Sequence, residues 1–293
     1  MNYTPNEIIL DTYNIKKLSG SNISDVSMLE NYEELDLSHC ENIRDVSKLG
    51  KVKKLNLSYT KIKDVSKLGN CEELDLSNCY NIRDVSKLRN VKKLNLNNTK
   101  IKDVSKLVNV KNLDLSDTNI SNVSMLGNCE VLNLSYCQNI RDFTMLGNVK
   151  KLYLSDTKIS DVSMLGNCEE LDLSHCENIS DVSMLGNVKK LILTDTKITD
   201  VSALGNCEEL VLSHCYNIKD VSMLGNVKEL YLFDTKISDV SALGNCEELD
   251  LSHCKNIRDV SMLGNVKKLH LNYTNILHFP KKIMNSLPDE IKL

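Results

Sequence analysis

Pairs of leucines recur along the chain at a nearly constant spacing, with one residue between the two members of each pair. In Leu74-Asp75-Leu76 the two leucines share one face of an extended segment, and Asp75 points the opposite way. Steps of 20 and 19 residues mostly alternate, and this short period predicts a solenoid whose coils bury their leucines against one another. The thirteen pairs begin at Leu35, Leu55, Leu74, Leu94, Leu113, Leu132, Leu152, Leu171, Leu191, Leu210, Leu230, Leu249 and Leu269.

Two kinds of coil alternate. Long coils carry Cys followed by one extra residue before Asn-Ile, as in Cys40-Glu-Asn-Ile. Short coils carry Thr and lack that extra residue, as in Thr60-Lys-Ile. The coils at Leu94 and Leu113 are both short and break the alternation. A degenerate fourteenth coil spans Leu18 to Leu29.

Two motifs in these coils resemble those of the leucine-rich repeat family over about residues 15–277. Leu-x-Leu-Ser-x-Cys-x-Asn-Ile-x-Asp is similar to the cysteine-containing class found in F-box proteins, and Ile-x-Asp-Val-Ser-x-Leu is similar to the internalin class. The resemblance implies an α/β repeat solenoid: a right-handed horseshoe or arc with one parallel sheet of 13–14 short strands and short 3-10 or extended convex segments. We expect an N-terminal cap with the degenerate first repeat at 1–30, a thirteen-coil solenoid at 31–277 and a C-terminal cap at 278–293.

Charge also alternates from coil to coil. Glu72 and Glu73 lie between Lys53-Lys54 and Lys92-Lys93, so neighbouring parallel strands place opposite charges side by side. Because each exposed pair contributes at most about 1 kcal/mol, this order is expected to fix the strand register more than to stabilise the fold.

Eleven cysteines occupy two columns of the repeat. Equivalent cysteines in every second coil lie about 9–10 Å apart by strand spacing, which is beyond disulfide reach, so we expect buried free thiols, no metal site and no cofactor. No apolar run approaches the roughly 20 residues of a membrane span, and no secretory signal is readable at the N-terminus. These features predict an intracellular, cytoplasmic protein that is a monomer and does not bind a membrane.

The net charge of −4 hides a gradient along the chain. Residues 41–112 hold 17 Lys and Arg against 8 Asp and Glu, a balance of +9, and residues 113–260 hold 12 against 23, a balance of −11. One column accounts for part of this, since the residue after Asp-Val-Ser is Lys early in the chain and Met or Ala later. This column is either a solvated face that drifted or a basic dock for an acidic partner, formed by Lys48, Lys67, Lys87 and Lys106.

The column between the paired leucines is expected to line the concave face. Its first six members are Asp or Asn, and apolar or aromatic residues appear only later, joined by Phe233 two positions after one of them. Either neutral variation or a binding patch explains this change, and tyrosine is typical of interface anchors. The candidate partner-binding residues are Tyr153, Ile192, Val211, Tyr231 and Phe233.

A third column follows each strand and alternates Asp with His. A His beside an Asp of the next coil favours the protonated imidazole. The column is therefore either a pH-sensitive rim or a row of ordinary hydrogen bonds on the surface. The rim residues are Asp156, His175, Asp195, His214, Asp234 and His253.

The columns contain no set of nucleophile, base and acid that converges on one pocket, so we expect no enzyme. The favoured function is a non-catalytic scaffold that binds a protein partner through its concave strand face. Resemblance to F-box proteins implies an alternative, a substrate-recognition subunit for a ubiquitin ligase. Nucleic-acid binding through residues 41–112 ranks below both, because no aromatic residues for base stacking interleave with those lysines.

Overall fold

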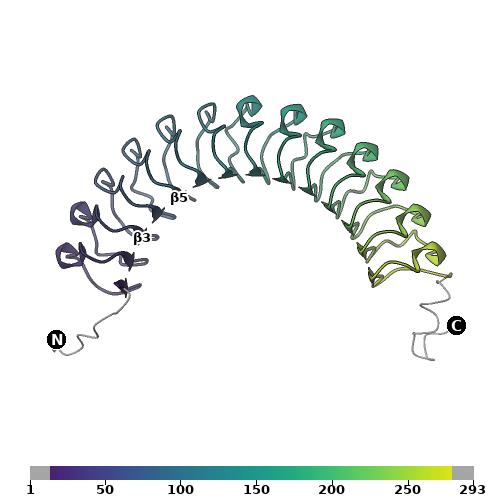
Figure 1. The fold of residues 1–293 in the computed structure, drawn as a ribbon, viewed down its shortest axis with the longest axis horizontal. Coiled ribbons are helices and arrows are strands. Elements are labelled where there is room, and N and C mark those ends of the chain that lie inside the picture. Colours follow the sequence, from purple (N-terminus) through teal and green to yellow (C-terminus); the bar gives the residue numbers. More distant parts are fainter. Residues whose placement is uncertain (1–13, 279–293) are drawn as a thin grey trace. The chain divides into compact units, whose positions relative to one another are not determined.

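The computed structural model describes residues 14–278. The chain divides into two compact units, Met1–Thr118 and Asn119–Leu293, and this boundary lies within the second of the two consecutive short coils. Within each unit every coil contributes one three-residue strand to the concave side and a tight turn to the convex side (Figure 1).

The first unit contains a parallel sheet in which each strand pairs with the next one along the chain. The central leucines face each other in the register, as in Leu55 opposite Leu74. Its elements are β1 (Ile15–Lys17), η1 (Ser27–Leu29), β2 (Glu34–Asp36), η2 (Ser47–Leu49), β3 (Lys54–Asn56), β4 (Glu73–Asp75), β5 (Lys93–Asn95) and β6 (Asn112–Asp114), where η denotes a 3-10 turn.

The second unit repeats the same parallel pairing from β7 to β14. Its elements are β7 (Val131–Asn133), η3 (Thr144–Leu146), β8 (Lys151–Tyr153), η4 (Ser163–Leu165), β9 (Glu170–Asp172), η5 (Ser183–Leu185), β10 (Lys190–Ile192), η6 (Ser202–Leu204), β11 (Glu209–Val211), η7 (Ser222–Leu224), β12 (Glu229–Tyr231), η8 (Ser241–Leu243), β13 (Glu248–Asp250), η9 (Ser261–Leu263) and β14 (Lys268–His270).

The predicted one-strand-per-coil parallel solenoid is confirmed. The predicted fourteenth coil has a strand of its own, β1, which pairs in register with β2. Residues 1–13 and 279–293, and with them most of the two predicted caps, lie outside the described residues.

The core is a stack of identical apolar layers. In the coil that holds β4, both strand leucines, Ile82, Val85 and Leu88 are at most 2% exposed. Each fully buried aliphatic side chain contributes about 1.5–3 kcal/mol, and neighbouring coils supply the contacts that no single coil could make alone.

Cysteine and threonine alternate in the core because they share a hydrogen-bond acceptor. The carbonyl oxygen of Leu57 accepts a bond from Thr60 Oγ1 at 2.7 Å and from Cys79 Sγ of the next coil at 3.1 Å. Leu154, Thr157 and Cys176 repeat this arrangement. All eleven cysteines are buried and none forms a disulfide, as predicted. Burial raises the pKa of Cys71 to about 12, so this thiol stays neutral.

The aspartate of Asp-Val-Ser organises the convex turns from the position before the N-cap. The N-cap position of η4 is Val162, and Asp161 precedes it. Asp161 Oδ1 accepts a hydrogen bond from the backbone N–H of Ser163 at 2.9 Å, which is an Asx turn. Asn122 makes the same bond to Ser124 at 3.0 Å, so an amide oxygen serves equally well.

Glycine follows Leu in these turns because the next coil passes very close. A Cβ atom on Gly166 would lie 2.2 Å from the carbonyl oxygen of Met184, well inside contact distance. This close approach favours glycine in most coils, although larger residues such as Arg89 and Val108 occupy the equivalent position in others.

Lysine and glutamate pair between neighbouring strands, as predicted from their alternation. Lys92 Nζ lies 3.0 Å from Glu72 Oε2, and Lys93 Nζ lies 3.1 Å from Glu73 Oε1. In the second unit Lys151 Nζ lies 3.0 Å from Glu170 Oε2. All of these side chains except Glu170 are substantially exposed, so their main effect is on register.

Candidate functional site

The apolar residues of the concave column lie on strands of the second unit. Ile192 on β10 pairs with Val211 on β11, and Val211 pairs with Tyr231 on β12, so these three side chains form a continuous strip. Tyr153 on β8 is separated from Ile192 by Asp172 on β9. All four side chains are half-buried against their neighbours and open to solvent.

Phe233 follows Tyr231 by two residues and completes the cluster, which we call the concave patch (Ile192, Val211, Tyr231 and Phe233). Other coils have Ser, Thr or Asn at the position of Phe233. Its ring packs edge-on to His214, with centroids 5.2 Å apart, and against His253 at 4.8 Å. Phe233 thereby links the concave column to the column of His and Asp residues.

The concave patch gives up hydrogen bonds that the rest of the column makes. Asp75 Oδ1 accepts a bond from the backbone N–H of Ser77 at 2.8 Å, and Asp172 does the same for Ser174 at 2.9 Å. An aliphatic side chain cannot accept such a bond, whose net value is about 0.5–1.5 kcal/mol. Loss of this bond favours a functional reason for the apolar residues. The polar members with the bond are Asp36, Asn56, Asp75, Asn95, Asp114, Asn133, Asp172 and Asp250.

The two tyrosines of this column present neutral hydroxyl groups. Burial raises the pKa of Tyr153 to about 12, and its phenol also donates a hydrogen bond to Glu170 Oε1 at 3.0 Å. Burial likewise raises the pKa of Tyr231 to about 12, with the carboxylates of Glu248, Glu229 and Glu209 adding to the effect. Both phenols therefore remain hydrogen-bond donors at any physiological pH.

A break in the charge alternation borders the concave patch and was not predicted. Glu209, Glu229 and Glu248 lie directly opposite one another on β11, β12 and β13. The signal was present in the sequence, because Val227-Lys228-Glu229 departs from the Val-Lys-Lys of most short coils. Each of these carboxylates lies two residues before a member of the concave column and on the same strand face.

The rim column adopts a backbone conformation that explains its composition. His175, Asp195, His214, Asp234 and His253 all have φ between 52° and 62°, in the left-handed region. Among residues other than glycine, Asn, Asp and His tolerate this region best. The recurrence of His and Asp therefore has a backbone cause that the sequence pattern did not reveal.

Two histidines of the rim face the predicted aspartates. His175 Nδ1 lies 3.3 Å from Asp195 Oδ2, and His214 Nδ1 lies 3.3 Å from Asp234 Oδ2. The phenol of Tyr216 donates to the same Asp234 oxygen at 3.0 Å. The rings of Phe233 and Tyr273 flank His253 instead. Asp156 accepts a bond from Gln138 Nε2 at 2.8 Å.

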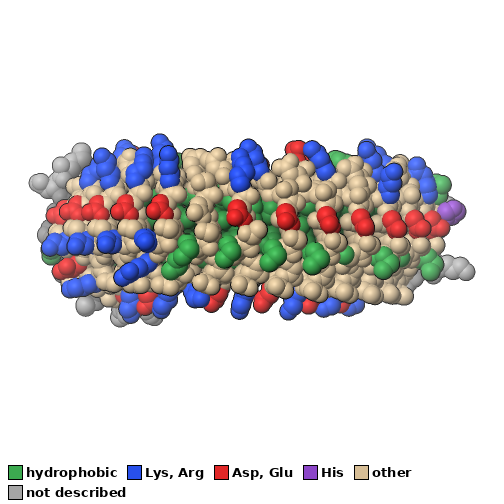
Figure 2. Space-filling view, turned by 90° about the horizontal axis from the view of Figure 1, so that it is seen from above, with side chains coloured by type: hydrophobic (Ala, Val, Ile, Leu, Met, Phe, Trp, Pro, Cys, Tyr) green, Lys and Arg blue, Asp and Glu red, His purple; other side chains and the backbone are tan. Residues whose placement is uncertain are grey.

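The lysine column lies on the convex turns of the first unit. Lys48, Lys67, Lys87 and Lys106 are all exposed, and Lys67 and Lys87 line one surface hollow together with Arg89. Over this unit Figure 2 shows basic side chains beside a row of acidic ones. The four lysines thus form one row on adjacent coils, as the predicted basic dock requires.

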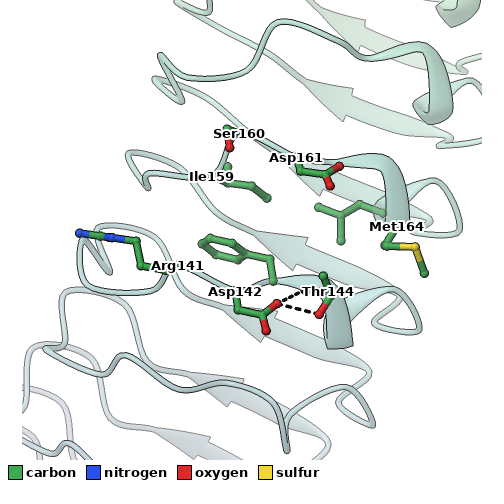
Figure 3. A pocket seen from close by; sticks show the side chains of 9 residues that line it. Arg141, Asp142, Thr144, Ile159, Ser160, Asp161 and Met164 are labelled. Carbon is green, nitrogen blue, oxygen red and sulfur yellow. Dashed lines mark hydrogen bonds between the residues drawn. The ribbon is translucent and has the colours of Figure 1, made fainter.

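The same convex column carries exposed methionines in the second unit. Over this unit Figure 2 shows hydrophobic side chains in a row beside the acidic row. The hollow in Figure 3 lies between two such turns, where Met164 and Asp161 of one coil face Asp142 and Thr144 of the preceding coil. The methionines, each between 51% and 63% exposed, are Met125, Met145, Met164, Met184, Met223 and Met262.

Metal-binding and membrane-spanning features are both absent from residues 14–278. No group of three or more His, Cys, Asp or Glu side chains is placed to hold a metal ion there. The same residues contain no helix long and apolar enough to cross a membrane.

Comparison with known proteins identifies the fold. No protein-family model matches the chain, and no curated protein matches it. Among solved structures, an internalin (InlF) from Listeria monocytogenes is 24% identical, with TM-score 0.64 over 91% of this chain and 83% of its own. The functional domain of InlJ from the same organism, which includes a cysteine ladder, is 20% identical, with TM-score 0.60 over 90% and 64% of the two chains.

A leucine-rich repeat protein from Leptospira interrogans is 17% identical, with TM-score 0.59 over 92% of this chain and 80% of its own. Identities of this size establish the fold and leave the activity open. With one parallel strand per coil, a leucine core and buried cysteines without disulfides, the chain has the fold of a leucine-rich repeat solenoid.

Proposed function

We propose that this protein is a non-catalytic interaction scaffold that binds a protein partner through the concave face of its second unit. The observation that carries the proposal is the in-register strip of Ile192, Val211 and Tyr231. These residues replace side chains that bond to the backbone, and they place apolar area on a solvent-facing sheet. Aromatic anchors beside charged residues are typical of the energetic centre of a protein interface.

Solved structures with this fold include assemblies with partners. One is the ectodomain of the Arabidopsis thaliana receptor kinase GASSHO1/SCHENGEN3 in complex with CASPARIAN STRIP INTEGRITY FACTOR 2, 17% identical with TM-score 0.56 over 37% of that chain. Another is the LRIM1/APL1C complex, in which the matched chain is 16% identical, with TM-score 0.61 over 53% of its length. These examples support binding as the use of the fold, and the concave patch supplies the location in this chain.

Site-specific photocrosslinking tests the proposal. Tyr153 or Tyr231 is replaced by the photoreactive aromatic p-benzoylphenylalanine, and Tyr80, an exposed tyrosine of the first unit, serves as the matched control. After irradiation in cells, both concave positions should capture the same protein, and Tyr80 should not. The Tyr153→Ala, Tyr231→Ala, Phe233→Ala triple variant should keep its circular dichroism and lose that partner in a pull-down. Equal capture from all three positions contradicts the proposal.

The same experiment addresses the narrower role of a substrate-recognition subunit for a ubiquitin ligase. In that role the chain must contact a ligase core as well as a substrate. Captured proteins should then include ligase subunits, and these should persist in the triple variant because they bind elsewhere. Their absence from every crosslinking position removes this role and leaves the scaffold proposal intact.

A second surface is proposed for the first unit, where the lysine row and the hollow beside Lys67, Lys87 and Arg89 favour an acidic partner. Nucleic acid is the alternative occupant, and a solved TLR13–ssRNA13 complex shares this fold at 20% identity, with TM-score 0.58 over 54% of that chain. Binding of generic single-stranded RNA that falls steeply with salt would favour nucleic acid. Salt-sensitive binding of an acidic peptide without RNA binding would favour protein.

We propose an intracellular, cytoplasmic location and a monomeric state. Eleven buried cysteines that form no disulfide support a reducing compartment, because small secreted domains rely on a disulfide framework. A fluorescent fusion that co-localises with secretory markers would contradict the location, and light scattering that gives twice the chain mass of 33.1 kDa would contradict the monomer.

A further inference from the structure

From β8 to β14 the first strand position alternates in charge except at one strand. Along the second unit this column has Lys151, Glu170, Lys190 and Glu209, and the next position should be Lys but is Glu229. The alternation resumes only at Lys268, after Glu248. Glu229 therefore lies between two other carboxylates, opposite Glu209 on one side and Glu248 on the other.

The neighbouring lysines form their ion pairs with other carboxylates and reach Glu229 only through longer-range attraction. Lys190 Nζ lies 3.0 Å from Glu209 Oε2, and Lys268 Nζ lies 2.9 Å from Glu248 Oε2. Lys228, the residue before Glu229, lies 3.6 Å from Glu208. Glu229 accepts a long hydrogen bond of 3.5 Å from the phenol of Tyr231, and it forms no ion pair within residues 14–278. Like charges opposite each other on adjacent strands are destabilising, so Glu229 lowers the stability of the sheet at β12.

The three carboxylates border an apolar sheet face. Val211 and Tyr231 lie on the same strands as Glu209 and Glu229, two residues further along and on the same side. Apolar walls strengthen a nearby charge interaction by excluding water. The surface thus combines apolar anchors with an excess of negative charge, three carboxylates against Lys190 and Lys268, which sets the sign of a complementary partner.

Resting on the proposed concave function, we infer that the partner presents a Lys or Arg side chain to Glu229, followed by an apolar side chain that packs on Val211 and Tyr231. The partner's cation takes the place of the lysine that the repeat has elsewhere in this column. Acidic segments and nucleic acids are repelled from this face, because both add negative charge opposite the three carboxylates. The occupant is therefore a basic, partly apolar protein segment.

Selection from an unbiased random-peptide display library on the full chain tests the inference. Peptides that Tyr231→Ala no longer binds are assigned to the concave patch, and these should be enriched in Lys or Arg next to an apolar residue. A synthetic copy with citrulline in place of Arg, which keeps the shape without the charge, or norleucine in place of Lys, should bind at least about tenfold more weakly.

Three variants separate the effect of charge on peptide binding from the effect of misfolding. Glu229→Lys restores the alternation, so it should raise Tm by about 2 °C while weakening the selected peptides at least about tenfold. Glu229→Gln should weaken them less, and the matched control Glu73→Gln, in the same column of the first unit, should leave their affinity unchanged. A stabilised variant that no longer binds excludes misfolding as the cause.

The possible outcomes distinguish the two proposals. Peptides that depend on Tyr231 but lack Lys and Arg, or that bind Glu229→Lys equally well, overturn this inference and leave the concave function standing. A selection that returns no peptide dependent on Tyr231 overturns both.

Discussion

The two units have the same interior and different surfaces. In the first unit the concave column is polar, and Asp75 and its equivalents bond to their own backbone. In the second unit Ile192, Val211 and Tyr231 replace such residues, and the convex lysines give way to methionines. Positions that point inward are held constant by packing, whereas positions that point outward are free to change. Departures from the repeat on outward positions are therefore the places to look for binding.

The largest expected effect is the loss of stability when a core leucine is removed from each unit, and it tests whether the two cores are equivalent. Leu74→Ala in β4 and Leu210→Ala in β11 each remove a buried side chain, at most 2% exposed, and should each cost about 2–5 kcal/mol. Hydrogen exchange should show the loss of protection centred on the altered coil and its neighbours. A difference of more than about 2 kcal/mol between the two substitutions would show that the cores differ as well as the surfaces.

Converting the second concave face into the first should abolish binding without loss of stability. The triple substitution Ile192→Asn, Val211→Asp, Tyr231→Asn returns acceptors for the backbone in the order that the repeat uses elsewhere, and it removes the apolar strip. We expect partner capture to fall at least about 100-fold, because the residues at the centre of an interface carry most of its binding energy. We expect Tm to stay unchanged or rise slightly, because the backbone hydrogen bonds are restored. Retained capture in a folded triple variant would rule out the concave patch as the binding surface.

Introducing an apolar residue into the concave column of the first unit measures the free energy of the lost backbone hydrogen bond. Asp75→Val in the first unit removes the bond to the Ser77 amide and should cost about 1 kcal/mol. Asp75→Asn keeps an acceptor, as Asn56 and Asn95 show at equivalent positions, and is the matched control. Chemical denaturation of the three proteins provides the measurement. No difference between Val and Asn would mean that the concave patch carries no such cost.

The lysine row should govern a weaker, salt-sensitive association. Replacing Lys48, Lys67, Lys87 and Lys106 by Glu should eliminate binding of a fluorescein-labelled decaglutamate peptide, which we expect the native chain to bind at low salt. Met164→Ser with Met184→Ser, in the same column of the second unit, is the control and should change nothing. Binding that survives charge reversal would show that the row is only a solvated face.

The smallest expected effect is a difference in pKa between aspartates in the convex turns of the two units. The backbone N–H and hydroxyl of Ser66 lower the pKa of Asp64, and Lys67 lowers it further. The hydroxyl and N–H of Ser163 lower the pKa of Asp161, but the neighbouring Asp181 opposes them. Asp161 should therefore titrate at a higher pH than Asp64, by carboxyl NMR at low salt.

A depressed folded pKa stabilises the folded state above the unfolded value and loses that effect as pH falls through the folded value. Acid sensitivity should thus appear below about pH 4, near the ordinary aspartate pKa, and Asp161→Asn should reduce it. Equal titration of Asp64 and Asp161 at low salt would contradict the difference between the two turns.

Much of the concave surface could be predicted from the sequence. The alternation of leucines with Asp, Asn or apolar residues placed Ile192, Val211 and Tyr231 on one face, because strand side chains alternate with a period of two. The separation of Tyr153 by Asp172 required the register, and the packing of Phe233 between His214 and His253 required side-chain positions. The repeat also predicted the pairing of Lys with Glu, but the direct opposition of Glu209, Glu229 and Glu248 depends on those three strands lying side by side.

By itself, the sequence determined the period, the parallel stack of short strands and the cysteines without disulfides, because these follow from spacing and from what a coil must bury. The tertiary structure alone decided which outward residues become neighbours. It showed that the His and Asp rim follows from a left-handed backbone, that Thr60 and Cys79 share one carbonyl, and that Glu229 has carboxylates on both sides. The physical reason is that a repeat fixes the pattern within each coil, whereas contacts between coils depend on register, which places residues about twenty positions apart within a few ångströms of each other.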